Sequence, residues 1–363
     1  PPIFFYTPHP PSDMLRSLVG SEMCIRDRKI TNGDEIIVDD GNTILESALD
    51  QGIDFPHGCR TGNCGACKSR KKSGEIEMSP FSEFALDEEE EKQGLILACR
   101  SVPWSDCEIE ILNEDDENDK NNLEIKNLKC EVINIKKVTR DIFIINLKLN
   151  DKNIFEFKAG QYAELYIGDC KEKHFSMANS PNTSELEFHI KTLDGGEVSN
   201  YVKNDLKLGE IITVKGPYGN AYLREKHKGP IIAVAGGTGL APILSIIEYS
   251  QEIEMKQPIN IYYGAQSEQE LYFTEQLNVI TKANNNLKFY PVISEKPKSK
   301  TIRQGLVTDA VIEDINDFDG YKAYLAGPPK MVESAEKILT NKGIRKVDIH
   351  SDAFYTPYDE IKE

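Results

Sequence analysis

The 363-residue sequence lacks any run of 18 or more apolar residues, the length that a membrane-spanning helix requires. It is also short of positive charge, because 60 Asp and Glu outweigh 43 Lys and Arg and give a formal net charge of -17. Such a charge repels phosphate backbones and anionic membranes, and no concentrated basic patch offsets it. The sequence therefore predicts a cytoplasmic protein that binds neither nucleic acid nor membrane.

No secretory signal accompanies the eight cysteines, because the first residues lack a basic start and a small-residue cleavage site. Without an export signal, disulfides are the weaker interpretation. Cys24 lies in an atypical first segment, and three scattered cysteines are expected to pack in cores: Cys107, Cys130 and Cys170. The other four lie at spacings that indicate a metal centre: Cys59, Cys64, Cys67 and Cys99.

Residues 1–28 show neither a helical nor a strand period. Their last part, SLVGSEMCIRDR, resembles a translated sequencing adapter rather than a natural segment. We therefore expect residues 1–28 to be non-native and base no fold prediction on them.

The next part of the chain, residues 29–113, combines short strands with one helix-like stretch and a loop rich in Gly and Cys. It is strongly acidic, with 8 Lys or Arg against 21 Asp or Glu between Lys29 and Asp116. The following run, NEDDENDKNN, has no apolar residue to bury and is typical of a flexible linker. We place an acidic linker at residues 114–126.

Residues 127–226 alternate apolar and polar positions, as in CEVINIKKV and IFIINLKL, which predicts a small antiparallel barrel. In residues 227–356, apolar strand runs such as IIAVA alternate with helix-like stretches, the βαβ order of a parallel sheet. Residues 357–363 form a tail. The predicted fold class is α+β and α/β multidomain: an N-terminal β-grasp, an antiparallel β-barrel and a C-terminal parallel-sheet α/β domain.

The cysteine loop PHGCRTGNCGACKSR has the spacing Cys59-x4-Cys64-x2-Cys67, and Cys99 follows after 31 residues. This is the plant-type [2Fe-2S] pattern. The glycines between the cysteines let the backbone wrap closely around sulfur. A zinc knuckle is the alternative, but structural zinc sites usually pair two short hooks of ligands. The region from Ile36 to Ile111 also resembles the plant-type ferredoxin domain.

Further along, FKAGQY, KHFSMANSP, HIKTLDGGEVSNYV and KGPYG together resemble the flavin domain of the ferredoxin-NADP reductase superfamily. The family motif Arg-x-Tyr/Phe-Ser/Thr falls on residues 173–176. The resemblance implies that Lys173 replaces the arginine near the FAD pyrophosphate, that Phe175 packs on the flavin and that Ser176 hydrogen-bonds the ring edge. A lysine keeps the charge but loses the bidentate fork, so cofactor binding is expected to be weaker or differently oriented.

The Gly-Gly turn of this region, Gly195 and Gly196, precedes a helix-like stretch that contains Ser199. Free backbone N–H groups at a helix start bind phosphate, so the pyrophosphate is expected there with Ser199 as a donor. The resemblance implies that the segment from His189 to Lys191 lines the flavin mainly through backbone groups. His189 by itself is interpreted as a barrel residue.

After the strand IIAVA, the turn GGTGLAPI resembles the GGTGxAP motif of the same superfamily, and YLAGPPKM resembles its CGPPxM motif. The resemblance implies that glycines of the first turn let the nicotinamide dinucleotide approach and that Thr238 faces the flavin. It also implies that the second turn borders the nicotinamide. These residues are Gly236, Gly237, Thr238 and Gly239 in the first turn, and Gly327, Pro328 and Pro329 in the second.

Two further features concern the nucleotide and the flavin. The loop QSEQELYF has two acids and no Lys or Arg, which favours the ribose hydroxyls of NADH over the 2′-phosphate of NADPH, although Lys300 or Arg303 could reach that phosphate. Near the end of the chain, HSDAFYTP resembles the family segment whose aromatic covers the flavin, which makes Phe354 the candidate. The candidate catalytic residues are Ser176, Thr238 and Phe354.

The order of ferredoxin, flavin barrel and nucleotide domain resembles the reductase components of bacterial oxygenases and the CDP-6-deoxy-glucoseen reductases. It implies electron flow from NADH through FAD and the [2Fe-2S] cluster to a separate acceptor protein. That acceptor is an oxygenase component, such as a phenol or aromatic-ring hydroxylase, or a sugar dehydrase. The ending HSDAFYTP slightly favours the sugar dehydrase. The alternative from another class is a non-catalytic redox-sensing or electron-carrier module.

The acidic run ALDEEEEKQG remains open between two interpretations. It is either the solvated face of a helix or a surface that steers a basic partner.

Overall fold

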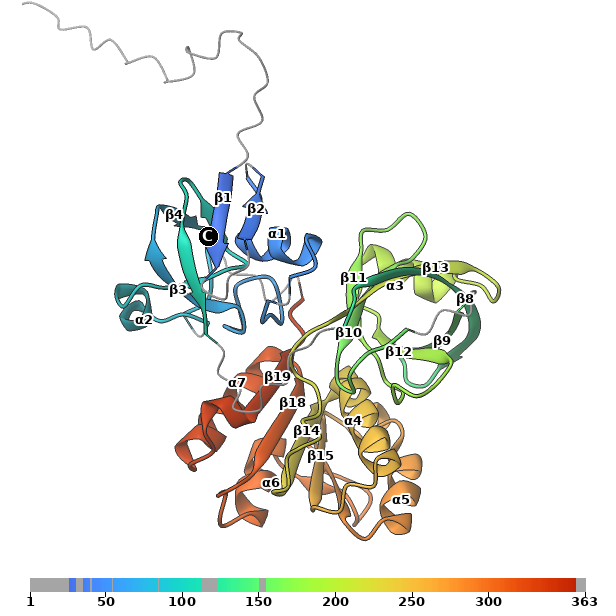
Figure 1. Cartoon of the computed structure of the whole chain (residues 1–363). Helices are drawn as coiled ribbons and strands as arrows, with labels where there is room; N and C mark the ends of the chain where they lie inside the picture. The colour runs from blue at the N-terminus through green and yellow to red at the C-terminus, as the bar shows by residue number, and fades with distance from the viewer. Residues whose placement is uncertain are drawn as a thin grey trace, which may run out of the picture.

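The computed structural model describes residues 26–30, 35–39, 41–53, 55–83, 85–112, 123–149 and 155–356. Within them the first strand begins at Arg26, so three residues of the segment expected to be non-native pair in a sheet. Residues 1–25, most of the linker (114–122) and the tail 357–363 lie outside the described residues. Figure 1 displays three units, with the N-terminal one in blue to cyan, the barrel in green and the C-terminal one in yellow to red.

The N-terminal unit is a mixed five-stranded sheet in the order β2-β1-β7-β3-β5, with a two-stranded ribbon of β4 and β6 beside it. Because β1 runs parallel to β7 and antiparallel to β2, the sheet has the β-grasp arrangement expected from the sequence. Its elements are β1 (Arg26–Ile30), β2 (Glu35–Val38), α1 (Ile44–Asp50), β3 (Lys68–Ser73), β4 (Ile76–Met78), α2 (Glu88–Lys92), β5 (Leu95–Leu97), β6 (Ser101–Pro103) and β7 (Glu108–Ile111).

Helix α1 begins where Thr43 and Glu46 form a capping box, which satisfies two backbone N–H groups that the helix itself leaves free. The helix buries Ile44, Leu45 and Ala48 in the core of this unit. Helix α2, in contrast, buries none of its residues, so the acidic run is a solvated helical face. In Figure 1, α2 lies at the edge of the unit away from the barrel.

The second unit is a six-stranded antiparallel sheet in the order β11-β10-β13-β8-β9-β12. A bridge between Met177 and Phe188 joins its two outer strands, which closes the sheet into a barrel. Cys130 is fully buried in the barrel core, as predicted. The elements are β8 (Lys126–Lys137), β9 (Ile142–Leu149), β10 (Tyr162–Tyr166), β11 (Lys173–Ser176), β12 (Glu185–Lys191), α3 (Glu197–Asn204) and β13 (Ile211–Tyr218).

The third unit is a six-stranded sheet in the order β17-β16-β15-β14-β18-β19, with every pair parallel. Separate apolar clusters cover its two faces, which is why its central strands are apolar throughout. The elements are β14 (Ile231–Gly236), η2 (Gly237–Gly239), α4 (Leu240–Glu252), β15 (Ile259–Ala265), η3 (Glu268–Glu270), α5 (Thr274–Ala283), β16 (Leu287–Ile293), β17 (Arg303–Gln304), α6 (Val307–Asp314), β18 (Lys322–Gly327), α7 (Pro329–Asn341), η4 (Lys346–Asp348) and β19 (Ile349–Ala353).

Strand order reverses direction at β14, because β15 lies on one side of it and β18 on the other. In open parallel sheets, ligands bind outside the carboxyl ends of the strands at such a point. The two glycine turns singled out in the sequence follow β14 and end β18, so both lie at this edge. Among the residues that the structure describes, no helix is long and apolar enough to cross a membrane.

Candidate functional site

The cysteine loop owes its shape to left-handed backbone positions at Arg60, Gly62 and Gly65, with φ of 57°, 78° and 73°. A side chain at Gly65 would place its Cβ 2.8 Å from the carbonyl oxygen of Ala85, so only glycine fits there. Cys99 reaches the same place from the turn after β5.

The four thiols are arranged as two pairs, Cys59 with Cys64 and Cys67 with Cys99, and the members of each pair interact directly. Backbone N–H groups of Thr61 and Asn63 donate to Cys59 Sγ at 3.4 and 3.3 Å. The hydrogen bond from Cys64, followed by these N–H groups, lowers the pKa of the Cys59 thiol to about 5, whereas the pKa of the Cys64 thiol is raised well above its ordinary value. At Cys59 this favours the thiolate, the form that ligates iron.

An arrangement of the four sulfurs in two pairs fits a two-iron cluster better than one zinc ion. Across the described part of the chain, no three His, Cys, Asp or Glu side chains gather around a single metal position. A structural zinc site would require four ligands around one ion.

The cysteine loop lies directly against the barrel. Arg60 Nη1 donates to Glu164 Oε1 at 2.5 Å, and the Arg60 guanidinium lies 4.0 Å from the ring centre of Tyr218. Tyr162 Oη donates to the carbonyl oxygen of Gly58 at 2.9 Å. From the C-terminal unit, Tyr355 Oη donates to the carbonyl oxygen of Asn63 at 2.9 Å. The loop that carries three of the four cysteines is therefore held by both other units.

Burial and neighbouring groups together determine the charge states at this contact. Burial would raise the pKa of Glu164, but the hydrogen bond with His174 and the charge of Arg60 lower it to about 2, so the ion pair is formed at neutral pH. Burial, followed by the charge of Arg60, lowers the pKa of His57 to about 3. The His57 ring is therefore neutral and packs edge-on against Tyr162 and Tyr218.

The proposed flavin residues of β11 differ in exposure: Lys173 is exposed, Phe175 is half-buried and Ser176 is buried. Ser176 Oγ donates to Asp352 Oδ2 of β19 at 2.8 Å. Just after Asp352, the backbone N–H of Phe354 donates to the carbonyl oxygen of Gly327, which places the half-buried Phe354 beside the second glycine turn. The barrel and the C-terminal unit therefore meet at the expected flavin and nicotinamide residues.

Asp352 was not recognised from the sequence. Burial raises its pKa to about 6, although the hydrogen bond from Ser176 acts in the opposite direction. Its carboxyl group thus titrates close to neutral pH beside the hydroxyl expected at the flavin edge. Such a shift in a site of this kind marks a functional candidate.

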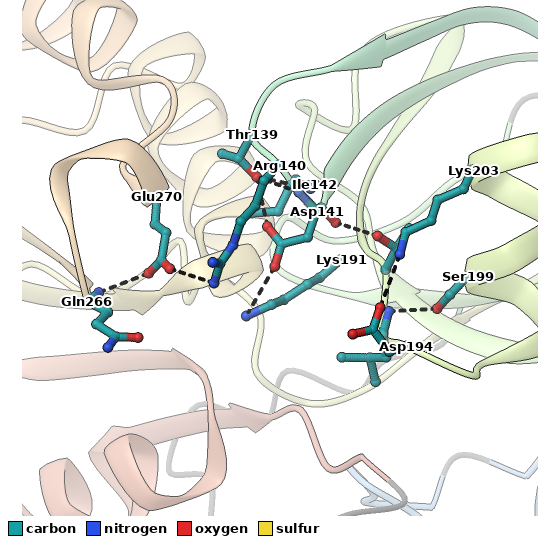
Figure 2. A network of polar contacts seen from close by, with 12 residues as sticks. Thr139, Arg140, Asp141, Ile142, Lys191, Asp194, Ser199, Lys203, Gln266 and Glu270 are labelled. Carbon is teal, nitrogen blue, oxygen red and sulfur yellow. Dashed lines mark hydrogen bonds and ion pairs between the residues drawn. The ribbon is translucent and has the colours of Figure 1, made fainter.

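The start of α3 fits a phosphate. Its N-cap is Gly196, no side chain caps the helix, and Gly195 has a φ of 78° with open space around it. Ser199 Oγ accepts a hydrogen bond from the N–H of Leu193 at 2.8 Å, so its own proton remains to be donated (Figure 2). These groups are those an FAD pyrophosphate requires.

His189 is buried, with Nδ1 2.9 Å from Tyr272 Oη and Nε2 3.0 Å from Glu187 Oε1. Its ring therefore packs in the barrel and also contacts the C-terminal unit through Tyr272. Lys191 is exposed at the end of β12 and lies 3.9 Å from Asp141 (Figure 2).

The two glycine turns at the sheet edge touch each other. A Cβ on Gly239 would lie 2.0 Å from the carbonyl oxygen of Ala326, and one on Gly236 would lie 2.8 Å from Pro328. Gly237, with a φ of 55°, instead faces open space. Helix α4 begins without a side-chain cap, and Thr238 is half-buried at this edge. The turns pack closely at Gly236 and Gly239 and leave the backbone of Gly237 open, which suits the approach of a dinucleotide.

The acids of the loop after β15 have protein partners. Glu270 pairs with Arg140 of the barrel at 3.1 Å and accepts from the N–H of Gln266 (Figure 2). Glu268 accepts from the backbone N–H groups of Lys298 and Ser299, which brings a lysine-bearing segment to this loop. Arg303 is held by Asp314 through two hydrogen bonds of 2.9 Å. The preference for NADH thus stays a prediction.

This combination of cysteine loop, flavin barrel and nucleotide sheet defines a flavin- and nicotinamide-dependent iron-sulfur reductase. Family models match in the same order: a 2Fe-2S iron-sulfur cluster binding domain at residues 29–103, an oxidoreductase FAD-binding domain at 129–222 and an oxidoreductase NAD-binding domain at 233–337. The predicted [2Fe-2S] cluster, FAD and nicotinamide nucleotide are thereby confirmed as its cofactors.

Relatives match over nearly their full length. The chain is 36% identical to the reductase component of propane 2-monooxygenase from Mycolicibacterium goodii, over 89% of this chain and 95% of that one. It is 38% identical to the ferredoxin--NAD(P)(+) reductase component of the naphthalene 1,2-dioxygenase/salicylate 5-hydroxylase systems from Ralstonia sp, over 87% and 94%. It is 32% identical to the CDP-6-deoxy-L-threo-D-glycero-4-hexulose-3-dehydrase reductase from Yersinia pseudotuberculosis, over 88% and 95%.

Among solved structures, an Amycolatopsis cytochrome P450 reductase is 28% identical with a TM-score of 0.76, covering 91% of this chain and 98% of that one. The chain belongs to the three-domain iron-sulfur flavin reductases of the ferredoxin-NADP reductase superfamily. It is an NAD(P)H-dependent oxidoreductase that transfers electrons, so the non-catalytic alternative is set aside.

Proposed function

We propose that this reductase takes its hydride from NADH and delivers electrons one at a time to an oxygenase component, a separate protein. When bound, FAD accepts the hydride and the [2Fe-2S] cluster carries single electrons. The contribution of the polypeptide is to position these groups and to tune their surroundings.

The observation that carries the proposal is the contact between the cysteine loop and the other two units. Arg60 and Gly58 bind the barrel through Glu164 and Tyr162, while the carbonyl oxygen of Asn63 accepts from Tyr355. Such a contact keeps the donor and acceptor sites of one chain adjacent, without any diffusional encounter between separate proteins.

For each residue of the flavin and nucleotide sites we propose a role. Ser176 is the hydroxyl at the flavin edge and shares its proton with Asp352. Thr238 in the first glycine turn and Phe354 beside the second are the residues we propose where the nicotinamide meets the flavin. The proposed cofactor contacts comprise Lys173, Phe175, His189, Lys191, Gly195, Gly196, Ser199, Gly236, Gly237, Gly239, Gly327, Pro328 and Pro329.

The metal ligands in this proposal are Cys59, Cys64, Cys67 and Cys99. Support comes from the two thiol pairs and from the backbone N–H groups that point at sulfur.

An oxygenase component is favoured as acceptor by the 36% identical relative, the reductase component of a monooxygenase. The 38% identical relative is the ferredoxin--NAD(P)(+) reductase component of dioxygenase and hydroxylase systems. A sugar dehydrase is the second candidate. The ending HSDAFYTP slightly favours it, and the 32% identical dehydrase reductase supports it. The cytoplasmic location and the preference for NADH belong to the same proposal.

Purified holoenzyme tests the function in two measurements. Rapid mixing with NADH should reduce the flavin and then bleach the cluster absorbance within one turnover, and kcat/KM should be higher with NADH than with NADPH. Turnover with purified oxygenase and dehydrase components then identifies the acceptor. Flavin reduction without cluster bleaching would contradict the internal route.

A further inference from the structure

One face of the N-terminal unit combines an exposed aromatic with a hollow. Trp104, the only tryptophan of the chain, is 53% exposed. Beside it lies an open hollow of about 360 Å³ lined by Gly41, Glu77, Ser79, Val102 and Trp104. Together with Glu75 these residues are called the Trp104 patch. Exposed tryptophan next to a concave surface is enriched at protein interfaces and costs free energy elsewhere.

The Trp104 side chain is held in place. Its Nε1 donates to Glu77 Oε2 at 2.8 Å, and its backbone N–H donates to the carbonyl oxygen of Glu75 at 2.9 Å. The N–H of Glu75 in turn donates to Ser105 Oγ at 2.9 Å. An aromatic that is already ordered loses little conformational entropy when a partner covers it.

The patch is joined to the cluster through the chain. Trp104 follows β6, which starts two residues after Cys99, and Glu77 of β4 pairs with Val102 of β6. Ser79 donates its N–H to the carbonyl oxygen of Arg100, the residue next to Cys99. At about 3.3 Å per residue, the five steps from Cys99 to Trp104 span at most roughly 17 Å.

The opposite flank of the cluster is already used, because Gly58, Arg60 and Asn63 contact the barrel and the C-terminal unit. An acceptor that approaches while these contacts persist must therefore dock on another part of the N-terminal unit. Glu75 and Glu77 are exposed at the Trp104 patch, which makes this surface attractive to a basic partner.

We propose that the Trp104 patch is the docking surface for the electron-accepting protein, which presents a basic surface with a Lys or Arg side chain over the Trp104 ring. This inference rests on the proposed function. One electron leaves the reduced cluster for the docked acceptor, so each NADH serves two dockings. A cation over an indole ring and beside two carboxylates gains both cation–π and ionic attraction.

Cytochrome c, a basic one-electron protein, is the probe, and titrations use the holoenzyme at low ionic strength. Docking should quench the fluorescence of the single tryptophan, and the Trp104→Phe variant supplies the blank. Glu75→Gln/Glu77→Gln should raise the Kd for cytochrome c roughly fivefold, and Trp104→Ala at least as much, since removing one central contact costs about 1 kcal/mol. The matched control is Glu89→Gln/Glu91→Gln on α2, which removes the same charge from outside the patch and should change Kd less than about twofold.

Ferricyanide reduction by NADH distinguishes a failure of the docking surface from a failure of the proposed function. Unchanged ferricyanide rates in all variants, with the Kd changes above, support the patch. Equal effects of the two double variants would mean steering by net charge alone and would overturn the patch, as would an unchanged Kd in all of them. Loss of ferricyanide reduction in the wild type would instead overturn the proposed function.

Discussion

At the scale of single residues, Asp352 is a site residue whose charge state depends strongly on its surroundings. Its carboxyl accepts the proton of Ser176, and burial raises its pKa to about 6. Below that pH the carboxyl is neutral, and above it the group adds a negative charge beside the hydroxyl proposed at the flavin edge.

Asp352→Asn tests this charge directly. In the wild type, flavin reduction by NADH should slow as pH rises through about 6, because the carboxylate that forms opposes the incoming negative charge. In the variant the rate should be flat across this range, as followed by flavin absorbance in single turnover. Asp317→Asn, at an exposed position, is the control. Parallel pH profiles for all three proteins would exclude Asp352 from the step.

The same pKa has a consequence for folding. A carboxyl whose folded pKa lies above its ordinary value of 3.8 disfavours the charged form, so its contribution to stability falls as pH rises from about 4 to 6.

Cys59→Ser should remove the cluster, because the pair with Cys64 then lacks one of its two sulfurs. The visible absorbance of the iron-sulfur centre should be lost while NADH still reduces the flavin, and cytochrome c reduction should fall at least about tenfold because single electrons leave through the cluster. Cys130→Ser, in the barrel core, is the comparison and should keep the cluster. A Cys59→Ser protein with full cluster absorbance would argue against this ligand set.

At the scale of elements, the start of α3 links local structure to cofactor binding. The helix is uncapped by side chains, and the Ser199 hydroxyl bridges inward to the Leu193 N–H (Figure 2). The free backbone N–H groups at such a helix start can bind an anion, whose charge the helix dipole favours.

Ser199→Ala removes one hydroxyl donor and leaves the Leu193 N–H without its acceptor, at a cost of about 1–2 kcal/mol. We expect FAD affinity to fall roughly tenfold, measured by equilibrium dialysis of the flavin. Asn200→Ala, the next residue and exposed on the same helix, should bind FAD as the wild type does. Equal affinity in both variants would place the pyrophosphate elsewhere.

At the scale of the whole molecule, specific ion pairs help to join the three units. Arg60 and Glu164 connect the N-terminal unit with the barrel, and Arg140 and Glu270 connect the barrel with the C-terminal unit. The first pair is largely buried beneath Tyr162 and Tyr218, whereas Arg140 is exposed. Truncating a partner of a buried pair is the more costly change.

Arg60→Ala should slow bleaching of the cluster after NADH addition by about tenfold while leaving flavin reduction intact, because the cysteine loop loses its anchor. Glu164→Gln should act in the same direction, and Arg140→Ala should not. Identical cluster bleaching in all variants would show that the ion pair does not position the loop.

Low pH should weaken the ion pair of Arg60 with Glu164, as the Glu164→Gln variant does. The pKa of Glu164 is depressed to about 2, so the stabilisation from this pair is present above the ordinary value of 4.5 and is lost as pH falls from there towards 2.

The sequence alone determined the unit order, the fold class and the cofactors, because these depend on local rules. Cysteine spacing, glycine turns and apolar periodicity act over a few residues and can be recognised without knowing what packs against them. Asp352 and Arg60 carried no such signal, since their partners Ser176 and Glu164 lie 176 and 104 residues away. Only the tertiary structure decided which carboxylates were already engaged and which side of the cysteine loop the other units cover, because burial and charge pairing arise when distant segments pack together.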